Sequence, residues 1–312
     1  MTGSSFFFPW EVSMIEWAQN SLGSVGTAIS RLFTLIGGET VTLVILLVIL
    51  FCYNKEAGKR CGLTILAASM WFPMIKNVVL RIRPYMEHES IRALSVPEGD
   101  ADPMDIVQQG YSFPSGHSAM ALSMYGSLAM EIRKKWAWFI GIALILLIGM
   151  SRFIMGVHYP TDVLAGWAVG LLALAGGTLL NRKVKKEWVR YAILLAISLP
   201  GVFWCTSRDY YTALGLLIGM TIAFPLEEKI CGYRDTRNPF AMALRVIGAM
   251  IVYFASDVLL KLPFSREFLN NGTLGANMIR TARYVVISIL LMAVYPKAFV
   301  LFEKVGPKKA KE

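Results

Sequence analysis

Long apolar runs recur along the whole chain and constrain its fold more than any other feature. Of the 312 residues, 55% are hydrophobic and only 17% are charged, and the mean hydropathy is +0.53. A helix of about 20 apolar residues crosses the hydrocarbon core of a bilayer. Backbone polar groups in that core must be satisfied within helices. The sequence therefore predicts an all-α fold, a polytopic transmembrane helical bundle.

Nine runs are candidates for membrane spans. They lie near residues 37–54, 61–81, 116–131, 136–153, 161–181, 188–206, 209–226, 239–260 and 280–302. Before them, Trp10, Trp17 and Phe33 stand among polar neighbours, which predicts an amphipathic segment lying in the membrane interface. We therefore divide the chain into an interfacial N-terminal segment, 1–36, a core, 37–181, and a C-terminal transmembrane extension, 182–312, of unknown role.

The positions of the basic residues predict the orientation of the bundle. Most of the 31 Lys and Arg residues lie in the loops 55–60, 131–135, 182–190 and 227–238 and in the tail from 297. Loops rich in Lys and Arg stay in the cytoplasm, so nine spans place the N-terminus outside and the C-terminus inside. The intervening loop 84–113 suits the outer side, since it carries the acidic residues Glu87, Glu89, Glu98, Asp100, Asp102 and Asp105.

The net charge of +10 is consistent with this membrane topology. Nucleic-acid binding is the weaker explanation, because the basic clusters alternate with spans and do not form one continuous stripe. We therefore expect the lipid bilayer, and no nucleic acid, as a partner. The sequence does not indicate the oligomeric state.

The first polar cluster is KNVVLRIRP, residues 76–84, at the outer end of the second predicted span. Lys76 and Arg83 are seven residues apart, so on a helix both side chains point from one face and could bind one anion. Alternatively, Arg81 and Arg83 are interfacial residues whose charged ends reach the headgroups. Lys76 lies deeper, and a buried cation within a span indicates a functional site.

The second cluster is FPSGH, residues 113–117, where the third predicted span begins. Ser115 is predicted to be an N-cap. Gly116 lacks a side chain that would obstruct approach to the first free amides of the helix, which together with the helix dipole form an anion site. His117 would then lie beside the anion, where it can give or take a proton near neutral pH. The alternative is that Ser-Gly is an ordinary helix cap.

The third cluster is SRFIMGVHYPTD, residues 151–162, between the fourth and fifth predicted spans. Arg152 closes one span, Gly156 allows a turn, and Pro160 suits the first position of the next helix. His158 and Asp162 are one turn apart, so the carboxylate can accept a hydrogen bond from one imidazole nitrogen and leave the other free to attack. The alternative is an ordinary loop histidine followed by a capping aspartate. The remaining histidine, His88, is predicted to lie on the surface.

In order and spacing, K-x6-RP at 76–84, PSGH at 114–117 and SR-x5-H-x3-D at 151–162 resemble the signature of the type 2 phosphatidic acid phosphatase superfamily. This superfamily shares its active site with the vanadium haloperoxidases, and the resemblance here is to its membrane branch. It covers roughly residues 37–181. The layout of nine spans with the N-terminus outside looks like that of glucose-6-phosphatase and of the sphingosine-phosphate phosphatases, which is an analogy of layout only.

The resemblance implies a phosphatase that needs no metal or other cofactor and works through a phosphohistidine, with residues 37–181 as its catalytic core. It implies that His158 is the nucleophile, Asp162 its orienting partner, and His117 the acid that protonates the leaving oxygen. It also implies a set of phosphoryl-binding residues, namely Lys76, Arg83, Ser115, Gly116 and Arg152. Three cations and helix-start amides are the groups that phosphoryl transfer requires for charge neutralisation.

The substrate and even the class of activity have alternatives at this stage. The leading expectation is a phosphate monoester or pyrophosphate of a lipid, hydrolysed at the extracytoplasmic face, whether periplasmic, extracellular or lumenal. A water-soluble sugar phosphate is the second. A transporter or binding protein that has kept the fold is the third, although the two halves show no repeat with broken helices in matching positions.

Overall fold

The computed structural model describes residues 3–96, 99 and 101–305 and is almost entirely helical in this part of the chain. The helices are α1 (Pro9–Ile36), α2 (Glu39–Val48), α3 (Lys55–Val79), α4 (Pro84–Glu87), α5 (Ile106–Gln109), α6 (Gly116–Ile132), α7 (Lys135–Ile154), α8 (Pro160–Lys183), α9 (Glu187–Ser198), α10 (Arg208–Ile230), α11 (Pro239–Leu259), α12 (Arg266–Asn270), α13 (Leu274–Ile289) and α14 (Phe299–Phe302). Short π or 3₁₀ segments follow α2, α9 and α13. The only β structure in the described ranges is an isolated bridge between Ser4 and Arg81.

The structure supports the predicted membrane bundle but only part of the span count. Among the described residues, five continuous helical stretches are long and apolar enough to cross a membrane, namely Lys55–Val79, Lys135–Ile154, Pro160–Lys183, Pro239–Leu259 and Leu274–Phe302. A sixth is possible if Pro9–Ile36 and Glu39–Tyr53, bent by 46° to each other, form one broken span. All nine predicted runs are helical, but α6 and α9 have only 17 and 12 residues.

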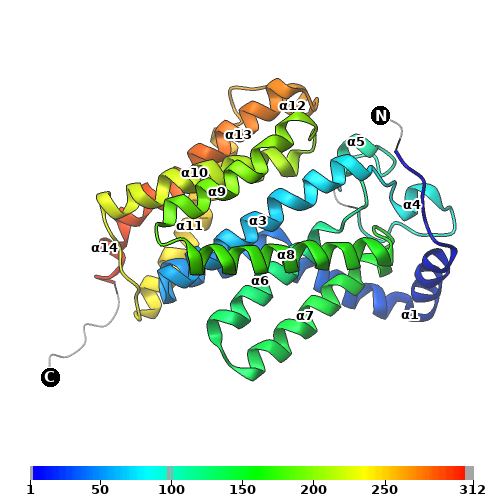
Figure 1. Ribbon diagram of the computed structural model, residues 1–312, viewed down its shortest axis with the longest axis horizontal. Helices are drawn as coiled ribbons and strands as arrows, with labels where there is room; N and C mark the ends of the chain where they lie inside the picture. Colours follow the sequence, from blue (N-terminus) through cyan, green and yellow to red (C-terminus); the bar gives the residue numbers. More distant parts are fainter. Residues whose placement is uncertain (1–2, 97–98, 100, 306–312) are drawn as a thin grey trace.

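Helix α3 is the centre of the bundle. It packs against α6 and α8 on one side and against α9 and α10 on the other, as Figure 1 shows. The outward-facing side chains of the surrounding helices are apolar, for example Phe139 on α7, Leu172 on α8 and Ile251 on α11, which are 78%, 63% and 62% exposed. An exterior of large apolar side chains is typical of a protein surrounded by lipid.

The two ends of the bundle differ in chemistry. At the end where α3 begins, Lys59 pairs with Glu187 at 2.7 Å and Glu228 at 3.0 Å, and Arg60 pairs with Glu131 at 2.6 Å. The turns after α6, α8 and α10 therefore gather at this end. Helices α1, α4 and α5 lie at the opposite end (Figure 1). Basic and non-basic loops thus lie at opposite ends of the bundle, as their predicted alternation requires. Within these loops, Glu98, Asp100 and the tail beyond residue 305 lie outside the described residues.

Helix α1 stays close to the end of the bundle that carries α4 and α5. It is bent at Gly23, whose φ is +53°. The side chain of Gln19, before the bend, donates to the carbonyl of Ile154 at 3.1 Å. After the bend, Thr34 contacts the side chains of Ser151 and Arg152. Both halves of α1 thus contact the last turn of α7, while the interfacial depth of residues 1–36 stays a prediction.

Two glycines of α8 allow it to approach the start of α6 very closely. A Cβ atom on Gly166 would lie 2.4 Å from the carbonyl oxygen of Ser115, and one on Gly170 would lie 2.7 Å from that of Ala119. Small residues four apart are a common device for close helix packing in membranes. The contact is continued by a hydrogen bond of 2.9 Å from the Ser115 amide to the carbonyl of Asp162. Glycine packing therefore places the beginnings of α6 and α8 side by side.

Candidate active site

Arg83 reaches the site by a different route from the one predicted. We expected Lys76 and Arg83 on one face of a helix, but α3 ends at Val79 and Leu80 adopts the left-handed conformation with φ +56°. The chain beyond Leu80 is extended and pairs with Ser4, whose amide donates to the Leu80 carbonyl at 2.8 Å. The helical-face argument was therefore wrong, because the N-terminal segment pairs with the chain where the helix would have continued.

Arg81 and Arg83 are not interfacial residues that reach toward headgroups. Arg81 is fully buried and Arg83 is 3% exposed. The Arg83 guanidinium donates to the carbonyls of Gly110, Val157 and Gln109 at 2.9, 2.9 and 3.0 Å. Its Nη1 lies 3.4 Å from Nε2 of His158. Backbone carbonyls from two loops thus fix Arg83 against the predicted nucleophile.

His158 is buried between Arg83 on one side and polar oxygens on the other. Its Nδ1 lies 3.5 Å from the Asp162 carboxylate and 3.4 Å from the hydroxyl of Ser112. A proton on Nδ1 can be shared with these oxygens, which leaves the lone pair on Nε2, the nitrogen beside Arg83. This is the tautomer that a nucleophilic histidine requires.

Asp162 is held by more partners than the sequence indicated. It is fully buried, and Pro160 occupies the first turn of α8 as predicted. The carboxylate accepts hydrogen bonds from the amide of Tyr159 at 2.7 Å, from Arg81 at 2.6 Å and from the Ser112 hydroxyl. Sequence reasoning missed Ser112 and misplaced Arg81. Arg81 lies within the first motif stretch, and Ser112 lies directly before the second.

The start of α6 has the predicted cap, with one difference. Ser115 is the N-cap, and its hydroxyl accepts from the amide and hydroxyl of Ser118. The Cβ atom that Gly116 lacks would meet the ring of Phe72 on α3 at 3.0 Å. The small size of Gly116 therefore serves close packing against α3, and its predicted role toward a phosphate stays a prediction.

His117 lies among the predicted cations. It is half-buried and makes no hydrogen bond or ion pair with the described residues. The charged and titratable groups whose fields act on it are Arg152, His158, Lys76 and Arg83. The three motif segments thus bring their charged groups into mutual range at one end of the bundle.

Two of these cations have unused donor capacity. Lys76 is 7% exposed, and its amine has no hydrogen-bond or ion-pair partner in the described ranges, lying 5.5 Å from the ring of Phe72. Arg152 is 3% exposed and donates to Thr34 at 3.0 Å, while its Nε is buried without a partner. Buried donors that lack partners are costly. An anion bound between them would satisfy these groups.

His88 is less exposed than predicted and lies apart from these contacts. Its ring packs edge-on against Phe7 at 4.5 Å between centroids and lies 6.2 Å from the ring of Tyr159. Its Nε2 is buried without a hydrogen-bond partner among the described residues. The surface interpretation failed because the N-terminal segment covers this part of the acidic loop.

The surroundings of His158, which lies in the loop between α7 and α8, keep its imidazole neutral. Burial, followed by the positive charges of Arg83, Arg152 and Lys76, lowers the pKa of His158 well below 6.5. Both effects disfavour the protonated ring. A neutral ring retains the lone pair that a nucleophile needs.

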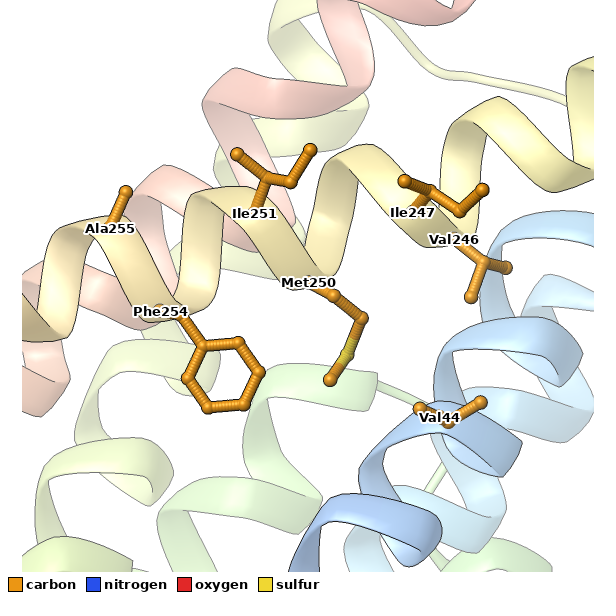
Figure 2. Close-up of a pocket in the computed structure, with 7 residues that line it drawn as sticks. All are labelled: Val44, Val246, Ile247, Met250, Ile251, Phe254 and Ala255. Carbon is orange, nitrogen blue, oxygen red and sulfur yellow. The ribbon is translucent and has the colours of Figure 1, made fainter.

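A separate groove lies between α2 and α11 and cannot perform this chemistry. Figure 2 shows the side chains of Val44, Met250 and Phe254 directed into the space between the two helices. The groove has a volume of 630 Å³, and none of its lining residues is titratable. It suits hydrocarbon chains, and the candidate active site is the polar cluster at the end of the bundle.

Two family models match the chain. Residues 59–186 match the PAP2 superfamily, and residues 211–308 match the transmembrane extension of PAP2 superfamily phosphatases. All three motif segments lie within the first match. The second match begins in α10 and lies within the predicted C-terminal extension, 182–312.

Several curated proteins share part of the sequence. An undecaprenyl-diphosphatase of Sulfolobus acidocaldarius is 30% identical over 40% of this chain and 55% of its own length. A phosphatidylglycerophosphatase B of Bacillus subtilis is 38% identical over 21% of this chain and 36% of its own length. A lipid A 1-phosphatase of Rhizobium etli is 42% identical over 38% of this chain and 47% of its own length. The chain thus spans about half or less of the length of these relatives, and no solved structure matches it.

Proposed function

Because the chain belongs to the PAP2 superfamily, we propose that it is an integral membrane phosphatase that hydrolyses a phosphate monoester or diphosphate of a lipid. The observation that carries the proposal is His158, buried with Arg83 at 3.4 Å from Nε2 and Asp162 at 3.5 Å from Nδ1. A lipid substrate is supported by the names of the relatives. These describe phosphatases of undecaprenyl diphosphate, phosphatidylglycerophosphate and lipid A.

The proposed first step transfers the phosphoryl group to His158. The Nε2 lone pair attacks phosphorus, and the bond from phosphorus to the leaving oxygen breaks. With the negative phosphate group of the substrate offsetting the nearby cations, His117 is protonated, and it gives this proton to that oxygen, so the lipid leaves as a neutral alcohol or as a lipid monophosphate. The Nδ1 proton of His158, shared with Ser112 and Asp162, balances the positive charge that develops on the ring.

In the proposed second step, water attacks the phosphohistidine. His117, now neutral, takes a proton from the water, the bond between nitrogen and phosphorus breaks, and inorganic phosphate leaves. Lys76, Arg83 and Arg152 offset the charge on the equatorial oxygens in both steps. No metal ion or other cofactor takes part in these steps.

The proposed topology follows from the loop charges and the helical runs. Nine spans place the N-terminus and the active site on the extracytoplasmic side and the C-terminus in the cytoplasm. The test uses a variant without the four native cysteines. An impermeant thiol reagent should label a cysteine introduced at Met104 in intact cells, and one introduced at Lys134 only after the membrane is opened. The reverse pattern would place the active site in the cytoplasm.

The substrate is tested by phosphate release from the purified protein in detergent with excess EDTA. We expect release from isoprenyl diphosphate, phosphatidylglycerophosphate or phosphatidic acid, unchanged by the chelator, and inhibition by vanadate, which mimics pentacoordinate phosphorus. Sphingoid phosphate and hexose phosphate complete the panel. An absolute requirement for magnesium would contradict the metal-free steps, and activity on hexose phosphate alone would contradict a lipid substrate.

The pH dependence tests the role of the buried imidazole. Because the pKa of His158 is held well below 6.5, the nucleophile stays neutral in mildly acidic solution. The value of kcat/KM should therefore begin to fall only as the pH approaches this lowered pKa. Replacing Arg83 by Gln removes one positive charge, which raises the pKa of His158. The acid-side midpoint should then move to higher pH on the same substrate. An unchanged midpoint would show that His158 is not the group that limits activity in acid.

A further inference from the structure

Arg81 lies between two carboxylates that come from distant parts of the chain. Its Nη1 donates to Asp162 at 2.6 Å and its Nη2 donates to Glu11 at 2.7 Å. All three side chains are 0% exposed. Arg81 also lies against the ring of Tyr159, with its central carbon 3.9 Å from the centroid. This set of three residues, Glu11, Arg81 and Asp162, is called the charge triad below.

Glu11 belongs to a segment of α1 that is fastened to the site by several contacts. Its carboxylate accepts from the amide and the hydroxyl of Thr161 at 3.1 and 2.6 Å. The carbonyl of Phe6 accepts from Arg81 at 2.8 Å. Glu11 lies outside the residues that match the PAP2 models, 59–186 and 211–308. The N-terminal segment therefore contributes a buried charge to a site whose other members lie in the matched domain.

The charge of the triad explains why a second carboxylate is needed. A buried arginine in contact with Asp162 alone would cancel its negative charge. Asp162 could then no longer stabilise the positive charge that develops on His158 when the bond to phosphorus forms. With Glu11 present, one positive and two negative groups leave a net charge of −1 beside the imidazole. Within the protein such a charge acts strongly on the imidazole, because the Asp162 carboxylate lies 3.5 Å from Nδ1 of His158.

We propose that Glu11 is a positioning residue for the phosphatase reaction: through Arg81 it orients Asp162 and preserves the negative charge that supports His158. This inference rests on the proposed function. It implies that the activity of the site depends on the packing of the N-terminal segment against the bundle.

The other charged and titratable groups around His158 come from every neighbouring element. Arg83 follows α3 and Lys76 lies within it, Arg152 comes from α7, and His117 lies in the first turn of α6. Asp162 on α8 is the only carboxylate within 4 Å of a ring nitrogen among the described residues. Because the others are cations or a second imidazole, a change in the net charge of the triad acts on His158 without a competing carboxylate.

The test measures both turnover and the titration of His158. Glu11→Gln keeps the size of the side chain but changes the net charge of the triad to zero. We expect kcat to fall roughly 10- to 100-fold with little change in KM, since Glu11 contacts none of the predicted phosphate-binding residues. The titration midpoint of His158 should fall by about half a pH unit or more. The chain has only three histidines, so labelled imidazoles give few NMR signals, and His158→Gln assigns the relevant one.

A double variant separates the charge effect from a loss of structure. Glu11→Gln with Arg81→Gln leaves Asp162 alone, which restores a net charge of −1. The His158 midpoint should return toward the wild-type value, whereas purely structural damage would make the double variant worse in both readouts. Glu11→Asp should recover part of kcat, because it retains the charge.

Glu16→Gln is the matched control, since it removes the same charge from the same helix, and Glu16 makes no hydrogen bond or ion pair with the described residues. It should behave as wild type. If Glu11→Gln titrates and turns over like wild type, the positioning role is wrong while the phosphatase function stands. If the wild type releases no phosphate from any substrate, the proposed function is wrong, and the His158 titration still decides whether the triad acts on the imidazole.

Discussion

Replacing His158 with alanine is expected to lower kcat for phosphate release by roughly 1,000-fold or more, with no recovery at any pH. In the proposed mechanism the imidazole supplies the attacking lone pair, and no other nucleophile stands in the same position between Arg83 and Asp162 in the described site. Removal of a covalent nucleophile leaves only binding and electrostatic stabilisation. The measurement is phosphate release by purified protein in detergent, under saturating substrate.

The control for this change is His88→Ala. His88 lies in the acidic loop against Phe7, and its replacement removes an imidazole without touching the predicted phosphate site. It should retain near-normal activity. A His158→Ala protein that folds as wild type and still releases phosphate at more than a few per cent of the normal rate would exclude the covalent scheme.

Replacing His117 with alanine is expected to lower kcat by roughly 100- to 10,000-fold for a lipid substrate, which has a poor leaving group. In the first turnover, release of nitrophenolate from p-nitrophenyl phosphate should be slowed much less than release of the lipid leaving group, because nitrophenolate leaves without protonation. His117 lies within the fields of Arg152, Lys76 and Arg83 but has no partner of its own among the described residues. This leaves its ring free to meet the leaving oxygen. The measurement is the rate at which each leaving group is released in a single turnover, before water attacks the phosphohistidine, compared between wild type and variant.

The dependence on the leaving group is the diagnostic part of this prediction. Arg152→Gln, which removes a proposed phosphate-binding cation, should slow first-turnover release of both leaving groups alike and provides the comparison. An equal slowing of first-turnover release for both leaving groups in His117→Ala would assign His117 to phosphate binding and contradict its role as the acid of the first step.

Much of the fold could be predicted because membrane helices are specified by local composition. The nine apolar runs are all helical, since the bilayer leaves the backbone no other way to satisfy its polar groups. The number of runs that span the membrane was less certain. Helix α9 has only 12 residues before it gives way to a 3₁₀ helix at Leu199–Phe203. Apolar composition alone does not distinguish a span from a short buried helix.

In the candidate site, contacts between residues close in sequence could be predicted, whereas contacts between distant segments could not. The contact of His158 with Asp162 follows from a spacing of four residues across a helix start. The path to Arg83 could not be read from spacing, because Ser4 pairs with the chain beyond α3 and ends the helix. Glu11 lies 70 residues from Arg81. No local pattern marks a carboxylate that becomes important only after the N-terminal segment packs on the bundle.

The central claim is that the phosphoryl group passes through His158. It is tested most directly by mixing enzyme with substrate labelled at phosphorus, quenching a single turnover in alkali, and locating the label by mass spectrometry. Bonds between phosphorus and imidazole nitrogen survive alkali. We predict label on His158 in the wild type, and more of it in His117→Ala with p-nitrophenyl phosphate as substrate, because nitrophenolate leaves without His117 while hydrolysis of the intermediate loses its base. Label on another residue, or turnover by the wild type without label on His158, would contradict the mechanism.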